Sequence, residues 1–297
     1  MLPGGLTALH AVVEAGSIRK ASQALGVAPS SVSRQIAVLE GQIGTVLLDR
    51  SAGGVSLTHA GKLVASYARS AVLDFDSLRA DLDDLRGSRR RLIRIAMVES
   101  IISGGPMDAV HSFRKRFDSV VFEMNIVPAP QIVELVKRGG CDVGISFCAP
   151  PDLDIREISK LHEPVVLVAP PDHPLTGRAA VSLHDVARWP VALPGENYGF
   201  RQMFDRACHA VGLDIKPALT ANGFEAIRDF VRSGAGIGVL PYRAVAREQR
   251  LNHLTALTID DAALSQTTIE ILVRRSRIAR VVRLFAEDLV SAILAWS

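Results

Sequence analysis

The stretch from Thr58 to Arg86 contains no proline and divides the chain into two parts of different character. Its apolar residues recur three or four positions apart and predict one continuous helix: Leu63, Tyr67, Ala71, Phe75, Leu78, Leu82 and Leu85. At 1.5 Å per residue this helix would be roughly 44 Å long, more than the short segment before it can cover. We therefore expect the apolar stripe to pair with the same helix of a second copy of the chain. Coverage by the C-terminal part of the chain is the alternative.

Three short helical segments precede this long helix. The first runs from residue 6 to 15 and ends at Gly16, and the second runs from residue 18 to 25 behind Ser17, a suitable N-cap. After Gly26 a very short turn leads to a third helix, in which Pro29 suits the first turn. Two helices joined in this way predict a helix-turn-helix.

The third helix has two different faces. At about 100° per residue, one narrow arc has the spacing of a face packed on a core and holds Val32, Ile36, Leu39 and Ile43. The opposite face combines small residues, hydroxyls and one long cation, namely Ser30, Arg34, Ala37 and Gly41 with Ser33 at the flank. Such a face suits the major groove of DNA, where a guanidinium contacts guanine or phosphate and hydroxyls contact phosphates. An ordinary solvent-exposed face is the alternative.

The segment after the third helix favours DNA over that alternative. VLLDR and GVSLT, residues 46–50 and 54–58, predict a small hairpin that turns at Ala52, Gly53 and Gly54. Arg50 would lie beside this turn. A basic residue on a wing next to a recognition helix reaches the phosphate backbone of DNA.

The part of the chain after Gly87 has another pattern. Apolar runs that read as buried strands alternate with segments of helical length, and they cover residues 92–98, 120–127, 141–147, 164–170, 190–194, 236–241 and 267–275. This alternation predicts a largely parallel α/β sheet with helices on both faces. The length of this part suits two small subdomains with a ligand-binding cleft at the carboxyl ends of their strands.

Composition limits the class of protein only broadly. The 297 residues are 48% hydrophobic and carry a formal net charge of +3, which is too small to indicate nucleic-acid binding without a local pattern. Neither a signal peptide nor an 18-residue apolar run is found, so we expect a cytoplasmic protein that does not enter the membrane. Its three cysteines fit a reducing compartment.

Residues 16–61 resemble the winged helix-turn-helix of LysR-type transcriptional regulators. The resemblance is dense over residues 6–61 and rests on these positions: Gly16-Ser17, Ala21, Leu25, Ser33-Arg34-Gln35-Ile36, Leu39-Glu40, Gly44, Leu47, Arg50, Leu57-Thr58 and Ala60-Gly61. The remainder is similar more loosely to the effector domain of that family, which itself resembles periplasmic binding proteins, through CDVGI, through residues 172–175 and through VRSGAGIGVLP.

The resemblance implies a fold and partners. It implies a winged helix-turn-helix at residues 1–57, a dimerising linker helix at 58–87, a hinge at 88–91 and an effector domain of two Rossmann-like subdomains at 92–297. Subdomain I would hold about residues 92–161 and 267–297, and subdomain II about residues 162–266. The DNA contacts would come from Ser30, Ser31, Ser33, Arg34 and Gln35, with Arg50 and Ser51 on the wing. Expected partners are operator DNA, a small-molecule effector and copies of the chain in dimers or tetramers, with RNA polymerase as a further candidate.

Three departures from the family pattern affect the DNA-binding face. Pro29-Ser30 stands where the family often has Gln-Pro, Leu48 replaces a frequent phenylalanine, and the wing lacks an extra arginine after Arg50. Operator sequences of relatives should therefore not be transferred to this chain. The wheel also places Gln35 nearer the buried edge than Arg34, so Arg34 is the expected principal contact.

The ends of the predicted strands indicate where an effector would bind. By the resemblance, the cleft is lined by Ser100, Ser103, Ser146, Phe147, Tyr198, Arg201, Asn222 and Phe224. Several of these positions also suit ordinary helix caps. Arg201 could bind a carboxylate through two hydrogen bonds or be a solvated helix charge, and Glu99 and Glu225 would oppose a highly anionic ligand if both point inward. A small carboxylate is the expected ligand.

Other functions have weaker support in the sequence. No metal-ligand pair and no Gly-x-Ser-x-Gly elbow is present, Gly234-Ala-Gly236-Ile-Gly238 reads as a helix-ending turn, and neither an enzyme nor a cofactor is expected. A redox switch through Cys141 and Cys148 is one alternative, although an extended strand would hold the thiols roughly 23 Å apart. A solute-binding protein is the other, and the N-terminal segment argues against it.

Overall fold

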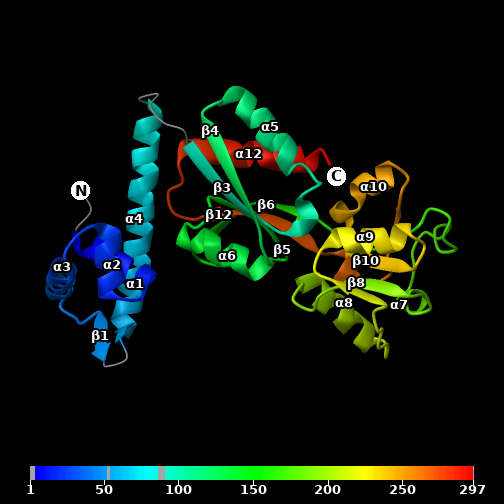
Figure 1. The fold of residues 1–297 in the computed structure, drawn as a ribbon, viewed down its shortest axis with the longest axis horizontal. Helices are drawn as coiled ribbons and strands as arrows, with labels where there is room; N and C mark the ends of the chain where they lie inside the picture. The colour runs from blue at the N-terminus through cyan, green and yellow to red at the C-terminus, as the bar shows by residue number, and fades with distance from the viewer. Residues whose placement is uncertain (1–3, 52–53, 86–90, 297) are drawn as a thin grey trace. The chain divides into compact units, whose positions relative to one another are not determined.

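The computed structural model describes residues 4–51, 54–85 and 91–296, which form two units (Figure 1). The side chains at positions 50, 51, 54 and 83–85 lie outside this description. The first unit comprises Met1–Ser88 with Ser276–Ala279, and the second comprises Arg89–Arg275 with Arg280–Ser297.

The first unit begins with the predicted helix-turn-helix. Its helices are α1 (Gly4–Ala15), α2 (Ile18–Leu25) and α3 (Pro29–Ile43). The Ser17 hydroxyl accepts a hydrogen bond from the Lys20 amide at 3.2 Å and caps α2. Gly26 ends α2 in the left-handed region, at φ 66°, and thereby allows the tight turn into α3. Pro29 lies in the first turn of α3, as predicted.

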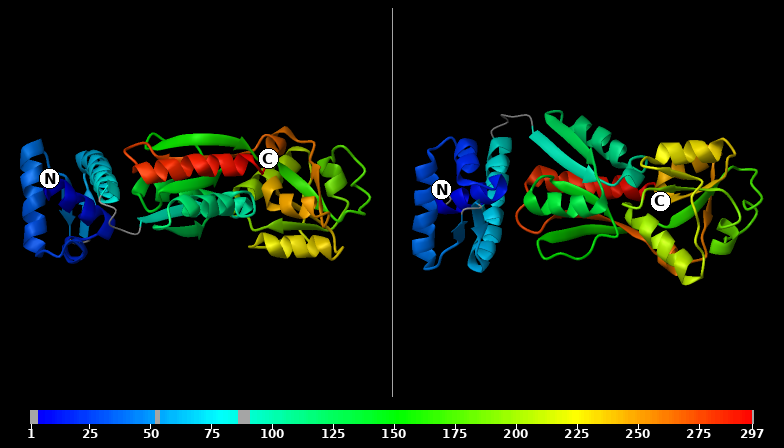
Figure 2. Two further views of the ribbon diagram at one scale, coloured as in Figure 1. Left: turned by 90° about the horizontal axis from the view of Figure 1, so that it is seen from above. Right: turned by 60° about the horizontal axis from the view of Figure 1, so that its bottom comes forward.

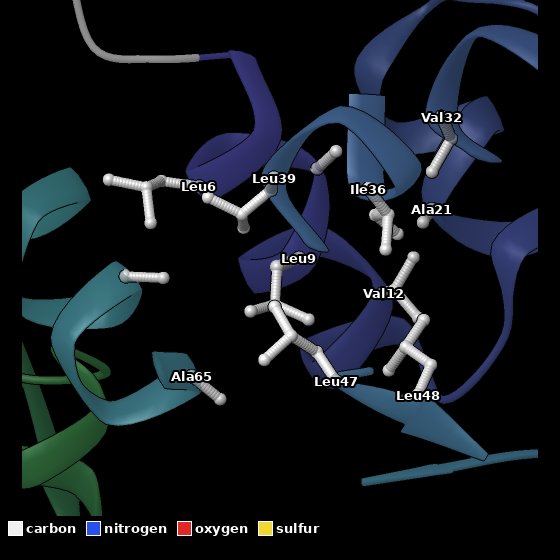
Figure 3. Close-up of a cluster of buried hydrophobic side chains, with 12 residues drawn as sticks. Leu6, Leu9, Val12, Ala21, Val32, Ile36, Leu39, Leu47, Leu48 and Ala65 are labelled. Carbon is white, nitrogen blue, oxygen red and sulfur yellow. The ribbon is translucent and has the colours of Figure 1, made fainter. Parts of the chain in front are cut away.

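A small core holds these helices together (Figure 3). Val32, Ile36 and Leu39 on α3 are buried as the wheel predicted, and they face Leu9 and Val12 of α1. The prediction for the fourth apolar residue is wrong, because Ile43 remains 43% exposed in the last turn of α3, beyond the buried segment.

The wing follows α3 as an antiparallel hairpin of β1 (Leu48–Ser51) and β2 (Gly54–Leu57). Glu40 on α3 fixes its start, since one carboxylate oxygen accepts the amides of Leu47 at 2.8 Å and Leu48 at 3.2 Å. The backbone of the next helix then passes very close to the wing. A Cβ on Gly61 would lie 2.0 Å from the Leu47 carbonyl oxygen, so only glycine fits there.

The long helix is α4 (His59–Leu85), close to the predicted limits. One side packs Ala65 and Ala68 into the core of the first unit. The other side leaves much of the predicted stripe uncovered, with exposed fractions of 65% for Leu63, 66% for Tyr67, 39% for Leu78 and 45% for Leu82. Within the same unit, Asp81 of α4 forms an ion pair with Arg277 at 2.6 Å.

The second unit contains two five-stranded sheets. The first has the order β4-β3-β5-β12-β6 and consists of β3 (Arg91–Met97), β4 (Val120–Ile126), β5 (Val143–Phe147), β6 (Ile155–His162) and β12 (Thr268–Arg274). The elements beside it are η1 (Glu99–Ile101), α5 (Pro106–Arg116), α6 (Ala129–Arg138) and α12 (Arg280–Leu294). Helices α5 and α12 lie side by side, as the views of Figure 2 show, and Phe113 packs against Phe285 between them.

The second sheet has the order β11-β7-β10-β8-β9. Its strands are β7 (Val165–Ala169), β8 (Val191–Pro194), β9 (Leu219–Ala221), β10 (Ile237–Pro241) and β11 (Thr255–Thr258). The helices of this part are α7 (Leu183–Val186), α8 (Gly199–Ala210), α9 (Phe224–Arg232), η2 (Tyr242–Ala244), α10 (Ala246–Arg250) and α11 (Ala262–Ser265).

The predicted fold class is confirmed, but the prediction of largely parallel sheets is wrong. In each sheet two strand pairs are parallel and two are antiparallel, because β12 runs against both β5 and β6, and β7 runs against both β10 and β11. The chain passes from the first sheet to the second after β6 and returns before β12, so the returning strand enters the first sheet in the opposite direction.

A buried ion pair lies where the chain crosses between the sheets. Glu163 follows β6 and is fully buried, and its carboxylate accepts the Arg243 amide at 2.8 Å and a hydrogen bond from the Arg243 guanidinium. The returning crossing is joined to the same place, since the Glu163 amide donates to the Thr267 carbonyl at 2.9 Å. The two crossing segments are therefore hydrogen-bonded to each other and to η2.

Candidate functional site

The outward face of α3 presents the side chains expected to contact DNA. Ser30 and Arg34 are exposed, as are Ala37 and Gly41. Val38 lies on the same side and is 54% exposed, which the sequence reasoning did not single out. An exposed apolar group beside a guanidinium and a hydroxyl can contact a thymine methyl in the major groove.

The remaining predicted DNA residues differ in their exposure. Ser31 and Ser33 are partly buried at the edge of the outward face. Gln35 turns toward α1, because its amide carbon would lie 3.2 Å from a Cβ placed on Gly4. The structure thus places Gln35 on the buried edge. Arg50 and Ser51 belong to β1, and their side chains lie outside the described residues.

The second unit contains a cavity of about 210 Å³ bounded by loops at the strand ends of both sheets. From the first sheet it is lined by Val98, Glu99, Ser100, Ile126, Val127, Pro128, Ala129 and Phe147. From the second it is lined by Asn197, Tyr198, Gly199, Phe200, Asn222, Phe224 and Pro241. We call this cavity the effector pocket.

Glu99 connects the two sides of the effector pocket. One carboxylate oxygen accepts the backbone amide of Phe224 at 2.8 Å, at the first residue of α9, and the other accepts the Tyr198 hydroxyl at 3.1 Å. The Tyr198 hydroxyl also lies 2.9 Å from the Asn222 carbonyl oxygen. Burial, together with the charge of Glu99, raises the pKa of Tyr198 to about 12, so the phenol keeps its proton.

Aromatic rings form much of the remaining lining. The ring centroid of Phe200 lies 6.0 Å from those of Phe147 and Tyr198 and 5.7 Å from that of Phe224. The rings of Tyr198 and Phe224 are 5.4 Å apart. These distances are typical of packed aromatic clusters. The wall of the pocket is therefore apolar except for a few polar groups and Glu99.

Five of the eight residues predicted for the effector pocket line it: Ser100, Phe147, Tyr198, Asn222 and Phe224. Ser103 is partly buried outside the lining, and Ser146 is fully buried with its hydroxyl 3.5 Å from the Ala129 carbonyl oxygen. Ser146 therefore supports the wall instead of facing the cavity.

The prediction that Arg201 faces the pocket is wrong. Only 6% of this residue is exposed, and its guanidinium donates to the Asp205 carboxylate at 2.9 Å and to the Pro194 carbonyl at 2.7 Å. Glu225 also has partners elsewhere, since it pairs with Arg228 and Arg232. Of the two glutamates expected to oppose an anion, Glu99 alone faces the cavity.

The apolar lining of the pocket was largely missed by the sequence reasoning. Val127, Pro128 and Ala129 directly follow β4, and Pro241 ends β10. The rule that ligands bind at the carboxyl ends of strands would have pointed to these residues. Phe200 lies two residues after Tyr198, in the first turn of α8.

The cysteines occupy different surroundings. Cys141 is buried, and burial raises its pKa to about 12, which keeps the thiol protonated and unreactive. Cys148 is exposed and has a positive φ of 47°. The two residues lie before and after β5, at opposite ends of the strand.

No helix in residues 4–51, 54–85 and 91–296 is both long and apolar enough to cross a membrane. In the same residues no group of three or more histidine, cysteine, aspartate or glutamate side chains is arranged to hold a metal ion.

A winged helix-turn-helix joined to a two-sheet domain with an internal pocket defines a ligand-responsive DNA-binding regulator. The family model described as "LysR substrate binding domain" matches residues 86–293, and "Bacterial regulatory helix-turn-helix protein, lysR family" matches residues 4–62. The chain belongs to the LysR family of transcriptional regulators, which bind DNA, oligomerise and carry an effector-binding domain.

Individual relatives agree over nearly the whole length. The RuBisCO operon transcriptional regulator of Allochromatium vinosum is 27% identical over 255 residues, which are 86% of this chain and 84% of that protein. A full-length OxyR variant from Pseudomonas aeruginosa has the same fold, with a TM-score of 0.67 and 18% identity over 99% of this chain and 94% of that one. Full-length CbnR, solved in complex with its target DNA, has a TM-score of 0.54 and 20% identity over 99% of this chain and 100% of that one.

Proposed function

We propose that α3 and the wing bind operator DNA and that a small molecule in the effector pocket alters this binding. The proposed assignment of roles follows the boundaries expected from the sequence, with residues 1–57 for DNA, 58–87 for dimerisation and 92–297 for the effector. The hinge expected at residues 88–91 lies, apart from Arg91, outside the described residues. The observation that carries the DNA-binding role is the outward face of α3, where Arg34 is exposed between small residues while Val32, Ile36 and Leu39 hold the helix on its core.

The assignment of contacts on this face follows from exposure. Ser30 and Arg34 project from the helix, with Ala37 and Gly41 leaving room for close approach. Arg34 is the principal contact, to guanine or to phosphate, and Ser31, Ser33, Arg50 and Ser51 contact the DNA backbone. Gln35 contributes less, because its amide lies against α1.

The uncovered stripe of α4 supports a dimer of the whole chain. Leu63 and Tyr67 are each about two-thirds exposed, at 65% and 66%, and Leu78 and Leu82 continue the stripe along the helix. Apolar residues at this spacing pair with a second helix. Two copies joined in this way would present two α3 helices to two half-sites on DNA.

The effector pocket supports the response to a ligand. It is lined by both sheets of the second unit, so a bound molecule contacts both, and ligand binding that favours one arrangement of the two shifts the population toward it. The DNA-binding units of an oligomer would then be spaced differently. Footprints with and without the effector that coincide would contradict this step.

The test compares two arginine variants of the full chain on the DNA upstream of its own gene. Arg34→Ala removes the proposed contact, and Arg188→Ala removes the same charge from an exposed position in the second unit. We expect Arg34→Ala to weaken binding by about 1–3 kcal/mol and Arg188→Ala to change it by less than about 0.5 kcal/mol. The measurement is fluorescence anisotropy over a range of salt concentrations.

The salt dependence shows which kind of contact Arg34 makes. A phosphate contact lowers the salt slope of the variant by about 1, whereas a base contact reduces the preference for this DNA over random sequence. If Arg34→Ala and wild type bind equally at every salt concentration, α3 does not bind DNA as proposed.

A further inference from the structure

The effector pocket contains one charged side chain, and that side chain is negative. Among its lining residues, all within the described part of the chain, Glu99 is the single ionisable carboxylate, and lysine, arginine and histidine do not occur. Arg201, the cation that the sequence predicted for this pocket, is held by Asp205 and by the Pro194 carbonyl. A carboxylate ligand in this pocket would therefore meet a like charge without a cationic side chain to offset it.

Glu99 also occupies a place that would otherwise attract an anion. Its carboxylate accepts the Phe224 amide at the start of α9, where Gly223 provides no side-chain cap. The first amides of a helix favour negative charge. Because Glu99 comes from the turn after β3 and α9 from the second sheet, the protein supplies its own carboxylate to this helix across the pocket.

The same carboxylate retains the capacity to bind a donor from a ligand. Each of its oxygens accepts one hydrogen bond from the protein, from the Phe224 amide and from the Tyr198 hydroxyl. An ionised carboxylate has about four lone-pair sites, so about two remain. An ammonium group in the pocket could use them.

The aromatic lining is a second feature of the pocket that attracts a positively charged ligand. Tyr198 and Phe224 are the two residues that donate hydrogen bonds to Glu99, and Phe200 and Phe147 continue the cluster of rings. Aromatic rings attract cations through their π faces, most strongly where water is excluded, and quaternary ammonium groups are bound in this way by several rings at once. A carboxylate next to clustered rings is the chemistry of a site for an organic cation.

We infer that the effector of this protein carries an ammonium group, which binds between Glu99 and the aromatic cluster of Phe147, Tyr198, Phe200 and Phe224. The inference rests on the proposed role of the pocket as the effector site, and it replaces the expected small carboxylate. Glu99 acts as the residue that determines specificity, because its charge selects the sign of the ligand.

The test uses three probes of one shape and different charge. They are choline, the alcohol in which carbon replaces its quaternary nitrogen, and the tert-butylacetate anion, each titrated into the full-length protein by isothermal calorimetry. We expect choline to bind at least about tenfold more tightly than the uncharged alcohol, with tert-butylacetate the weakest. The variants are Glu99→Gln, which keeps an oxygen to accept the Phe224 amide, and Phe224→Leu, which removes a ring but keeps an apolar side chain.

Glu99→Gln should reduce the preference for choline over the alcohol to within about twofold, and Phe224→Leu should weaken choline more than the alcohol. The control Glu196→Gln removes the same charge from an exposed residue outside the lining and should keep the full preference. Equal binding of choline and the alcohol to wild type, or an unchanged preference in Glu99→Gln, overturns the inference.

Tighter binding of tert-butylacetate also overturns it, while leaving the pocket as the effector site. If none of the three probes binds at millimolar concentration, the cation assignment fails, whereas the proposed role of the pocket is tested separately by the footprints with and without the effector. The DNA-binding test with Arg34→Ala is independent of all these results.

Discussion

Glu163→Gln tests whether the buried ion pair at the two crossings stabilises the effector domain. Glu163 is 0% exposed and Arg243 is 2% exposed, and two hydrogen bonds join them. The amide would keep an acceptor for the Arg243 backbone but leave its guanidinium without the opposing charge. Loss of one partner from a buried pair costs about 3–5 kcal/mol, and we expect about 3 kcal/mol because glutamine retains part of the hydrogen bonding.

Tryptophan fluorescence during urea unfolding reports this change in the second unit. The chain has two tryptophans, Trp189 and Trp296, and both belong to that unit. With a urea dependence of about 2–3 kcal/mol per M, the midpoint should fall by roughly 1–1.5 M. Glu157→Gln, at an exposed position on β6, should shift the free energy of unfolding by less than about 0.5 kcal/mol. A Glu163→Gln midpoint equal to that of Glu157→Gln would refute the reasoning.

The remaining predictions concern the first unit. Leu63→Asp should shift the dimer toward monomer in analytical ultracentrifugation, because the exposed stripe of α4 would bury a charge; an unchanged sedimentation coefficient would contradict the role of the stripe. Gly61→Ala should destabilise this unit by at least about 2 kcal/mol, because its Cβ would lie 2.0 Å from the Leu47 carbonyl oxygen. Gly41→Ala should stabilise the unit by about 0.5–1 kcal/mol, because Gly41 lies within α3 with open space around it. Hydrogen exchange of the α3 amides measures both effects. Burial lowers the pKa of His10 below its ordinary 6.5, so its contribution to stability is full above pH 6.5 and is lost as pH falls below that value. The free energy of unfolding of His10→Gln should therefore depend less on pH between about 7.5 and 5.5 than that of wild type. An equal pH dependence in the two proteins would argue against this assignment.

The sequence predicted the elements that depend on local chemistry. Ser17 caps α2, Gly26 ends it and Pro29 opens α3, and each acts through residues at most a few positions away. The seven apolar runs after residue 87 each became a strand, and four of these strands are buried along their whole length, namely β5, β7, β8 and β10. The strands that were not predicted are β6, β9 and β11, which are short or carry polar residues on an exposed side.

Local sequence patterns could not predict contacts between residues that are far apart in the sequence. Glu99 and Phe224 are 125 positions apart, and nothing in the neighbourhood of either shows that one caps the helix of the other. The antiparallel entry of β12 between β5 and β6 depends in the same way on how the chain returns to the first sheet.

Arg201 illustrates the opposite difficulty. Its position at the start of α8 suits a ligand contact, but Asp205 lies one helical turn further on and takes the guanidinium. The sequence spacing allowed Arg201 either to contact a ligand or to pair with Asp205. The direction of the Arg201 side chain decided between the two. The residue that does carry charge into the pocket, Glu99, had been considered from the sequence as an obstacle to anions.

Methylation protection by dimethyl sulfate tests most directly whether α3 reads DNA. The reagent modifies guanine N7, which lies in the major groove. On the DNA upstream of its own gene, saturating wild-type protein should protect guanine N7 at two symmetric half-sites about one helical turn or a multiple apart, as two α3 helices of a dimer would. Full occupancy of the DNA with every guanine N7 as reactive as in free DNA would contradict the placement of α3 in the major groove.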